Sequence, residues 1–320
     1  MRSCRRRWTR AETVSRDYQA IGVDIGGTKT IVAAVDGAGN VQTRVAFETR
    51  SARGFASGLA ELTESIRVVS RESAGAGAEF CGIGIGCAGP VNPLRGTIHN
   101  PYTLPGWDGA DIVTPLREAF QIPVRLENDA DAAAVGEFHF GAGRGASPLV
   151  MVTLGTGVGG AILLNGQIYR GVNGEHPELG HVPVLPDGPG CYCGTHGCWE
   201  SLASGSAISA AGKDFGFADS RAVFSAAPED ARAAAILQRA VSASVTATWT
   251  LLHTALPQRI ILGGGIGEEH FDIFATAMRE QISRATQIPK HSVGIVKARL
   301  GNDAGVIGAA CLAFQNTNPP

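Results

Sequence analysis

The sequence lacks long apolar runs, and none reaches the roughly 18 residues that a membrane-spanning helix needs. It also lacks an excess of charge of either sign, because 27 basic residues stand against 29 acidic ones. No strong field therefore draws the chain to nucleic acid or to anionic lipid. The arginine-rich start has no apolar segment behind it, which argues against a signal peptide. We expect a cytoplasmic protein with no membrane partner and no specific nucleic-acid partner.

The number of cysteines is odd, so they cannot all form disulfides within the chain, and aromatic residues are scarce at 6%. Seven cysteines without a signal peptide argue against a disulfide framework. Glycine is abundant instead, with 43 residues, which indicates tight turns and close backbone approaches. A length of 320 residues fits two domains of ordinary size.

Two predicted hairpins with Gly/Thr-rich turns stand out. The first joins strands at 21–23 and 31–35, and the second joins strands at 149–154 and 161–164. A separation of about 130 residues between them suggests two related halves. Glycine turns let backbone N–H groups approach phosphate oxygens, and Asp24 in the first turn is a candidate ligand for Mg²⁺. Either turn alone is more typical of an ordinary hairpin, and only the two turns together favour phosphate binding.

The segment Glu127-Asn128-Asp129 follows a short predicted strand and precedes a predicted helix at 130–138. A kinase needs a carboxylate that accepts the proton of the attacking hydroxyl, and Asp129 has the required chemistry. The alternative is that Asn128 or Asp129 only caps the helix. Asp131 cannot share the helix face of Asp129, because residues two apart point in different directions.

A cluster of possible metal ligands lies in the Gly/Pro-rich region 171–205. One histidine and three cysteines, His181, Cys191, Cys193 and Cys198, give the ligand set of a structural zinc site with no open position. His196 is a competing fourth ligand, and redox chemistry by Cys191 and Cys193 is an alternative. A further glycine run at 263–265 follows a predicted strand and suits either a nucleotide or a tight turn.

These segments, in this order, resemble the ROK family of repressors and sugar kinases within the actin-like ATPase superfamily. The resemblance runs from Ile21 to Phe314. The matching segments are residues 21–30 and 154–160 (two phosphate motifs), 100–107 (sugar-proximal loop), 127–130 (catalytic Asp) and 178–200 (zinc signature).

The resemblance implies an ATP-dependent hexokinase that phosphorylates a primary hydroxyl, with ATP, Mg²⁺ and Zn²⁺ as cofactors and Asp129 as general base. The residues implied to bind the hexose are Gly89, Asn100, Asn128, Asp129, Glu178, His181 and Glu200. Those implied to line the ATP site are Asp24, Gly26, Gly27, Thr28, Lys29, Thr156, Gly157 and Gly264. The implied zinc ligands are His181, Cys191, Cys193 and Cys198.

The resemblance also implies an α/β protein with the two-lobed actin-like ATPase (ribonuclease H-like) fold. We expect a disordered basic tail at residues 1–20, a smaller lobe at 21–127 plus 301–320, and a larger lobe with the zinc loop at 128–300. A homodimer is usual for this family, with a tetramer as the alternative.

The sugar itself stays open between glucose, fructose and N-acetylated hexosamines. His176-Pro177 stands where glucokinase-type members often have Ala-Gly, and is similar to fructokinase-type members. Residues 187–189 resemble N-acetylmannosamine kinases, and Asp131 replaces an asparagine common in the family. A repressor would need a helix-turn-helix module before Ile21, where only about twenty residues stand. A sensor without catalysis would need neither Asp129 nor the phosphate turns.

Overall fold

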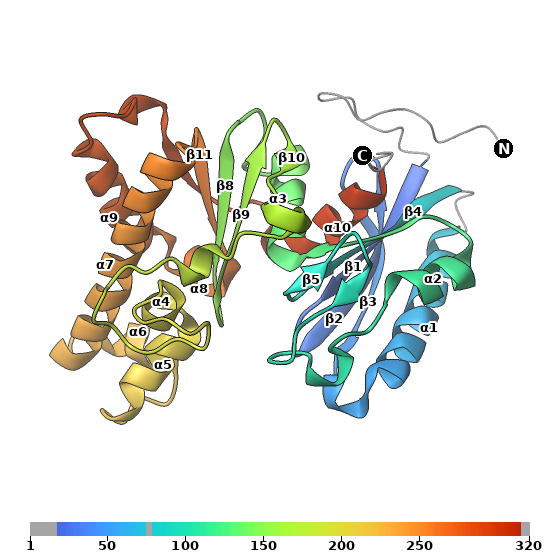
Figure 1. The fold of residues 1–320 in the computed structure, drawn as a ribbon, viewed down its shortest axis with the longest axis horizontal. Helices are drawn as coiled ribbons and strands as arrows, with labels where there is room; N and C mark the ends of the chain where they lie inside the picture. Colours follow the sequence, from blue (N-terminus) through green and yellow to red (C-terminus); the bar gives the residue numbers. More distant parts are fainter. Residues whose placement is uncertain (1–17, 75–78, 315–320) are drawn as a thin grey trace. The chain divides into compact units, whose positions relative to one another are not determined.

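A five-stranded mixed sheet forms the framework of the N-terminal part of the chain (Figure 1). The computed structural model describes residues 18–74 and 79–314. The strand order is β3-β2-β1-β4-β7. The bounds are Tyr18–Ile25 for β1, Lys29–Asp36 for β2, Val41–Glu48 for β3, Glu79–Cys87 for β4 and Val124–Asn128 for β7. β1, β2 and β3 are antiparallel neighbours, whereas β4 and β7 run parallel to β1.

The predicted tail ends earlier than residue 20. Residues 1–17 lie outside the described residues, but Tyr18, Gln19 and Ala20 already belong to β1. Gln19 is buried and its side chain accepts a hydrogen bond from Ser73, and Tyr18 pairs with Glu79 of β4. The prediction was wrong for these three residues, because pairing with β4 extends the strand beyond its apolar centre.

A second five-stranded sheet repeats the arrangement of the first. Its strands are β8 (Leu149–Leu154), β9 (Val158–Leu164), β10 (Gln167–Ile168), β11 (Arg259–Gly263) and β12 (Gly294–Lys297), in the order β10-β9-β8-β11-β12. β8, β9 and β10 are antiparallel neighbours, and β11 and β12 run parallel to β8. The predicted relation between the two halves is thereby confirmed at the level of topology.

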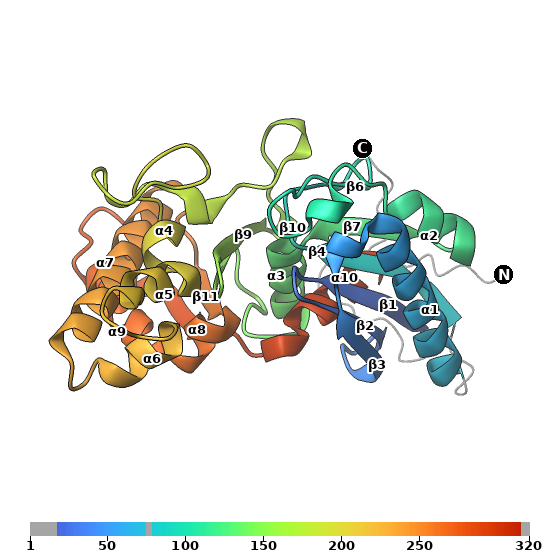
Figure 2. The same ribbon diagram turned by 90° about the horizontal axis from the view of Figure 1, so that it is seen from below.

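Helices cover both faces of the first sheet (Figures 1 and 2). They are α1 (Phe55–Ala74), α2 (Val113–Phe120), α3 (Asp129–Phe140) and α10 (Ala304–Phe314). α1 packs on β2 and β3, whereas α10 packs on β1 and β4 and also contacts α3. Leu62, Ile66 and Val69 of α1 are buried, as their helical spacing predicts.

The helices associated with the second sheet form a separate set. They are α4 (Glu200–Ala203), α5 (Gly205–Lys213), α6 (Ser220–Ala226), α7 (Ala231–Thr254), α8 (Gly264–Glu269) and α9 (Phe271–Ser283). The short elements of the chain are β5 (Val91–Asn92), β6 (Thr97–Ile98), η1 (Ser51–Arg53), η2 (Pro105–Trp107), η3 (Val172–Gly174), η4 (Leu179–His181), η5 (Lys290–Ser292) and η6 (Gly301–Asp303). α7 buries Leu237, Val241 and Leu252 on one face, as predicted.

The described chain divides into two compact units. The first holds the residues up to Arg144, Arg170–His176 and the residues from Asn302 on, and the second holds Gly145–Tyr169 and Pro177–Gly301. This division differs from the predicted lobes, which assigned residues 128–144 to the second. α3 packs on α10, β4 and β7, so tertiary contacts place it in the first unit.

Glycines let the backbone of α10 pack directly against the backbones of β4 and α3. A Cβ on Gly84 of β4 would lie 1.7 Å from the carbonyl oxygen of Ala309, and a Cβ on Gly308 would lie 1.7 Å from that of Ala132. Real Cβ atoms do not approach a carbonyl oxygen so closely, so a side chain at Gly84 requires α10 to move away from β4, and one at Gly308 requires α10 and α3 to separate.

Gly308→Ala is therefore expected to destabilise the chain by about 3 kcal/mol, the upper part of the range for overpacking. Helix propensity alone predicts the opposite sign, a gain of roughly 1 kcal/mol. The matched control is Gly294→Ala, whose Cβ would have its nearest neighbour at 3.8 Å. Denaturant unfolding of both variants measures the effect, and equal midpoints would contradict the packing argument.

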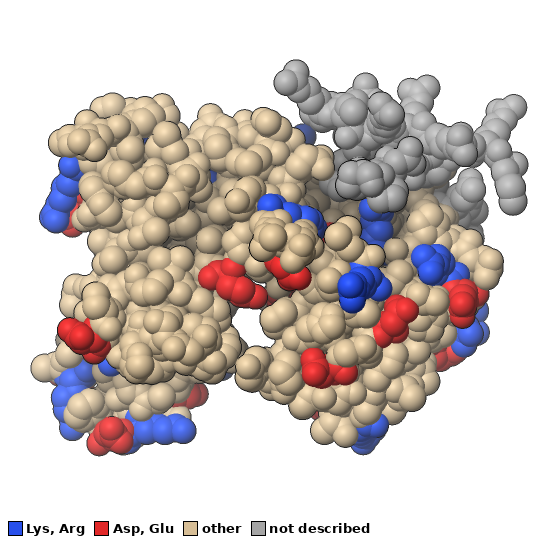
Figure 3. Space-filling view, viewed as in Figure 1, with Lys and Arg blue, Asp and Glu red and all other residues tan. Residues whose placement is uncertain are grey.

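No helix within residues 18–74 and 79–314 is long and apolar enough to cross a membrane. On the face drawn in Figure 3, acidic and basic side chains are scattered among uncharged residues.

Candidate active site

The turn between β1 and β2 contains the first predicted phosphate motif. The N–H of Gly26 donates to the carbonyl oxygen of Lys29 over 2.9 Å. Thr49, which sequence analysis missed, holds the turn from outside: its N–H donates to Thr28 O (2.9 Å) and its hydroxyl to Gly26 O (2.7 Å). Gly27, Thr28 and Lys29 are exposed. The turn is thus fixed from behind while its tip is accessible to a phosphate.

Asp24 lies at the end of β1, directly before this turn. Burial first, and then the nearby Asp129 carboxylate, raise the pKa of Asp24 to about 7 against the opposing charge of Lys29. A Cβ on Gly305, at the start of α10, would lie 2.6 Å from Asp24 Oδ2. A buried carboxylate of this kind is stabilised in its charged form by a divalent cation, and oxygen ligands suit Mg²⁺. Asp24 therefore fits the predicted magnesium role.

Asn128 is the N-cap of α3, one of the two predicted candidates. Its Oδ1 accepts hydrogen bonds from the N–H groups of Ala130 (2.8 Å) and Asp131 (3.4 Å). Its Nδ2 faces Gly89, where a Cβ would approach to 2.5 Å. The structure therefore brings together Asn128 and Gly89, two of the predicted sugar-binding residues, and a larger residue at position 89 would displace the Asn128 amide.

Asp129 is the first residue of α3 and is partly exposed. Its Oδ1 accepts a hydrogen bond from the N–H of Ala130 at 2.8 Å. Desolvation raises the pKa of Asp129 above the usual value, with the Ala130 N–H and the charge of His176 opposing and Asp131 adding. A carboxylate with a raised pKa that is still reachable from solvent has the properties of a general base.

Two ion pairs flank Asp129 at equal distances along the chain. Arg170 pairs with Glu127, two residues before Asp129, and His176 Nδ1 lies 2.9 Å from Oδ2 of Asp131, two residues after it. Burial raises the pKa of Glu127 to about 7, with Arg170 opposing. The sequence does not reveal these pairs, because 43 and 45 positions separate their members.

Asn100, a predicted sugar-binding residue, is held by hydrogen bonds within its own region of the chain. It is buried, and its Oδ1 accepts from the N–H groups of Tyr102 (3.1 Å) and Thr103 (2.9 Å). Its Nδ2 donates to the carbonyl of Ala88 (3.1 Å) and to the Thr103 hydroxyl. These bonds use the full capacity of the amide, so Asn100 holds its own loop in shape.

The second phosphate motif lies in the other unit, between β8 and β9. The N–H of Gly155 donates to Gly157 O (3.0 Å), and the N–H of Gly205 donates to Gly155 O (2.7 Å). Gly264 follows β11 with φ of 78°, and a Cβ there would lie 2.6 Å from the carbonyl oxygen of Leu154. The structure thus brings the Thr156–Gly157 turn and Gly264 together, as a nucleotide site on this unit requires.

The four predicted zinc ligands form one group. Their donor atoms all lie within 4.8 Å of one another. His181 Nδ1 is 3.4 Å from Cys191 Sγ, and Cys193 Sγ is 3.5 Å from Cys198 Sγ. A tetrahedral zinc ion holds neighbouring N and S ligands roughly 3.5–3.8 Å apart. The donor set and spacing fit this ion, and the group contains His181 rather than His196.

Tyr192 connects the metal group to the predicted sugar-binding glutamates, and sequence analysis missed it. Its ring meets that of His181 edge to face, with centroids 5.0 Å apart. Burial, a hydrogen bond with Glu200 and the charges of Glu200 and Glu178 raise its pKa above the usual value. Glu200 Oε2 also accepts from the N–H of Val158 at 2.8 Å, beside the phosphate turn.

The predicted site residues therefore form two groups, one on each unit. The first unit holds Asp24, Gly26, Gly27, Thr28, Lys29, Gly89, Asn100, Asn128 and Asp129. The second unit holds Thr156, Gly157, Glu178, His181, Cys191, Cys193, Cys198, Glu200 and Gly264.

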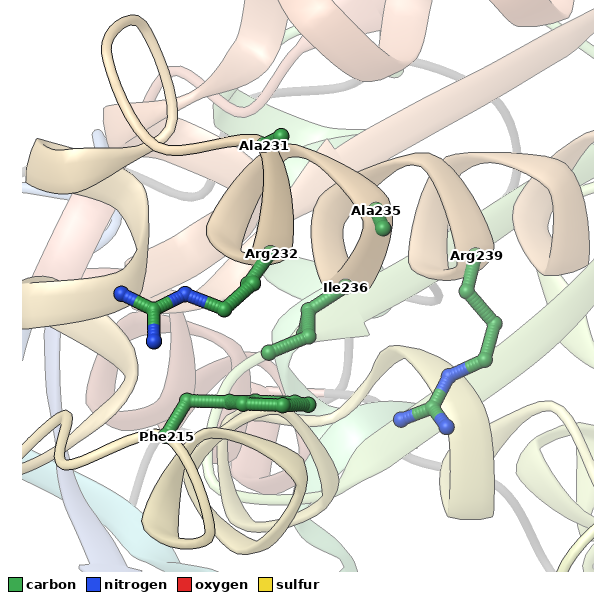
Figure 4. A pocket seen from close by; sticks show the side chains of 6 residues that line it. All are labelled: Phe215, Ala231, Arg232, Ala235, Ile236 and Arg239. Carbon is green, nitrogen blue, oxygen red and sulfur yellow. The ribbon is translucent and has the colours of Figure 1, made fainter.

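A separate pocket of about 400 Å³ on the second unit contains none of the predicted residues (Figure 4). It lies between the loop after α5 and the start of α7, and its lining residues are Phe215, Ala231, Arg232, Ala235, Ile236 and Arg239. The Arg232 guanidinium is paired with Asp230.

Two units with the same sheet order, glycine turns after the first strand of each, and carboxylates at the ends of β1 and β7 define an actin-like ATPase fold. The family model described as "ROK family" matches residues 20–316. The chain therefore belongs to the ROK family and is a ROK-family sugar kinase, which confirms the prediction.

Individual proteins in this group are similar over nearly the whole chain. The glucokinase of Thermotoga maritima is 35% identical, with 91% of this chain and 96% of the relative covered. The ROK hexokinase structure from Thermus thermophilus has a TM-score of 0.81 at 34% identity, covering 92% and 98%. A ROK family glucokinase from Streptomyces griseus, solved with glucose and AMPPNP, has a TM-score of 0.76 at 30% identity, covering 93% and 100%.

Proposed function

We propose that the chain transfers the γ-phosphoryl group of ATP to the primary hydroxyl of a hexose, with glucose as the preferred acceptor and Asp129 as the general base. The observation that carries the assignment of the base is the environment of Asp129: a partly exposed carboxylate with a raised pKa at the first turn of α3. The glucokinases among its relatives support glucose. Fructose, mannose and N-acetylated hexosamines are the alternatives.

Each group of residues has a separate role in the proposed reaction. Asp129 accepts the hydroxyl proton as the oxygen attacks, while Asn128 and Gly89 beside it position the sugar. Thr28 and Lys29 on the first unit, and the residues of the Thr156–Gly157 and Gly264 turns on the second, bind the phosphates and the nucleoside. Asp24 would hold Mg²⁺, which neutralises phosphate charge when it is bound.

The second unit contributes Glu178, His181 and Glu200 as sugar ligands. Zinc, held by His181 and the three cysteines, would keep the zinc loop rigid and fix the orientation of the His181 ring. Four protein ligands leave no position for a catalytic water. Zinc content, magnesium dependence, the homodimer and the cytoplasmic location stay predictions.

A coupled assay of ADP formation over a panel of hexoses and amino sugars tests the function. The expected result is the highest kcat/KM with glucose, with phosphorylation at the primary hydroxyl verified by NMR of the product. Metal content is measured on the same preparation. ADP formation that no sugar stimulates would contradict the proposal. A preference for fructose would change the assigned sugar from glucose to fructose but leave the proposed reaction the same.

The pH profile of kcat/KM is expected to fall on the acidic side at a higher pH than an ordinary aspartate would give. The base acts only when ionised, and because desolvation raises the pKa of Asp129, it takes up a proton at a higher pH than an exposed aspartate. The pKa of Asp24 is about 7 without metal, so protons compete with Mg²⁺ for this carboxylate as the pH falls. Rate profiles at limiting and saturating Mg²⁺ separate the two effects. A profile that falls only at about pH 4, where an ordinary aspartate titrates, would contradict a base with a raised pKa.

A further inference from the structure

The segment 170–176 crosses to the first unit and is tied to it at both ends. Its first residue, Arg170, pairs with Glu127, and its last residue, His176, pairs with Asp131. The two acidic partners stand two positions before and two positions after Asp129. The segment therefore brings two basic side chains to the acidic residues on either side of Asp129 in the sequence, and the second of them, His176, is titratable.

The pair between His176 and Asp131 is secluded from water. The Asp131 side chain is 1% exposed and that of His176 is 10% exposed. Asp131 Oδ2 accepts from His176 Nδ1 at 2.9 Å, whereas Asp131 Oδ1 is buried without a hydrogen-bond partner among the described residues. Because a buried carboxylate is costly without a counter-charge, His176 is the group that makes an ionised Asp131 tolerable.

The other groups around Asp129 do not replace this counter-charge. Arg170 is committed to Glu127 on β7, and Lys29 at the start of β2 is exposed. Asp24 on β1 adds a further acidic group, and the Cys87 thiol on β4 is buried with its pKa raised by desolvation, so it stays neutral. α10, which packs on α3, has no charged side chain. Among the described ion pairs, the partner of Asp131 is His176.

We propose that His176 is a positioning residue for the phosphoryl transfer: held as a cation by Asp131 against the first turn of α3, it balances the buried Asp131 charge and so favours the ionised form of Asp129. The same contact ties the 170–176 segment to α3. This inference rests on the proposed function, because it assigns to His176 a role in the ionisation of the proposed base.

The test compares His176→Gln, Asp131→Asn and the double variant by the pH profile of kcat/KM for the sugar. His176→Gln leaves Asp131 without its counter-charge, so the acidic limb is expected to move up by about one pH unit, the effect of one charge at a partly buried site. On the shifted acidic limb the rate falls about tenfold relative to the parent, and above that limb it approaches the rate of the parent. Asp131→Asn removes the buried acid and moves the limb down. The double variant exchanges the ion pair for two neutral amides and returns the limb to within about 0.3 unit of the parent.

A purely structural tie would behave differently. It would lower the rate by the same factor at every pH and leave the limb in place in all three variants, and this result would overturn the inference. A double variant whose limb stays where His176→Gln puts it would also overturn it. If His176→Gln does not fold, Asp131→Asn still tests the proposal. An acidic limb of its pH profile that stays where the parent has it contradicts the proposal.

The control is His253→Gln, an exposed histidine of α7 whose Nδ1 contacts the carbonyl of Trp249, and its profile is expected to match the parent. The proposed function and the role of His176 can be refuted separately. A parent protein that phosphorylates no sugar refutes the proposed function, whereas an active parent with an unmoved limb in the variants refutes only the role of His176.

Discussion

Asp129→Asn is expected to lower kcat about a thousandfold while sugar affinity changes less than about threefold. General-base catalysis contributes roughly 10²–10⁴ in rate, and an amide cannot accept the hydroxyl proton. Asparagine keeps the shape of the side chain and an oxygen that can accept from the N–H of Ala130, as Asp129 Oδ1 does at 2.8 Å. The fold and the hydrogen bonds to the sugar are therefore retained. Coupled-assay kinetics and calorimetric sugar titration measure the two quantities.

The matched control for this substitution is Asp108→Asn. Asp108 is an exposed aspartate of the same unit, directly after η2, and its kinetics are expected to match the parent. Near-normal turnover by Asp129→Asn would remove Asp129 from the mechanism. A parallel loss of sugar binding would instead show that the carboxylate holds the sugar rather than accepts its proton.

Cys193→Ser is expected to remove bound zinc and to lower both stability and activity. Cys193 is exposed, so the substitution deletes a metal ligand with little loss of packing. We expect kcat/KM to fall about 10- to 100-fold, because His181 loses the metal that orients its ring. The midpoint of thermal unfolding is expected to fall by roughly 10 °C, corresponding to a few kcal/mol for a unit of this size. Metal analysis and calorimetry give these values.

Cys81→Ser serves as the control, because Cys81 lies on β4 of the other unit and outside the metal group. A parent protein without a transition metal, unaffected by a chelator in stability and rate, would contradict the zinc prediction. Loss of activity upon mild oxidation of such a metal-free protein would favour the redox alternative for Cys191 and Cys193.

Much of the local structure could be predicted from the sequence. The hairpin turns follow from their glycines, the α3 N-cap from Asn128, and the metal group from four ligands within eighteen residues. Strand β3 was missed although its side chains alternate between half-buried and exposed from Val41 to Glu48. That period of two was the available signal, but no uninterrupted apolar run marks this edge strand.

The sequence by itself determined which chemical groups are present and which lie near one another along the chain: the two glycine turns, the Asp129 carboxylate and the four members of the His/Cys group. It did so because a turn or a local ligand set depends on neighbouring residues. Only the tertiary structure decided that His176 meets Asp131, that Arg170 meets Glu127, and that α3 belongs with α10. Those pairings join residues far apart in sequence, and no local pattern encodes such contacts.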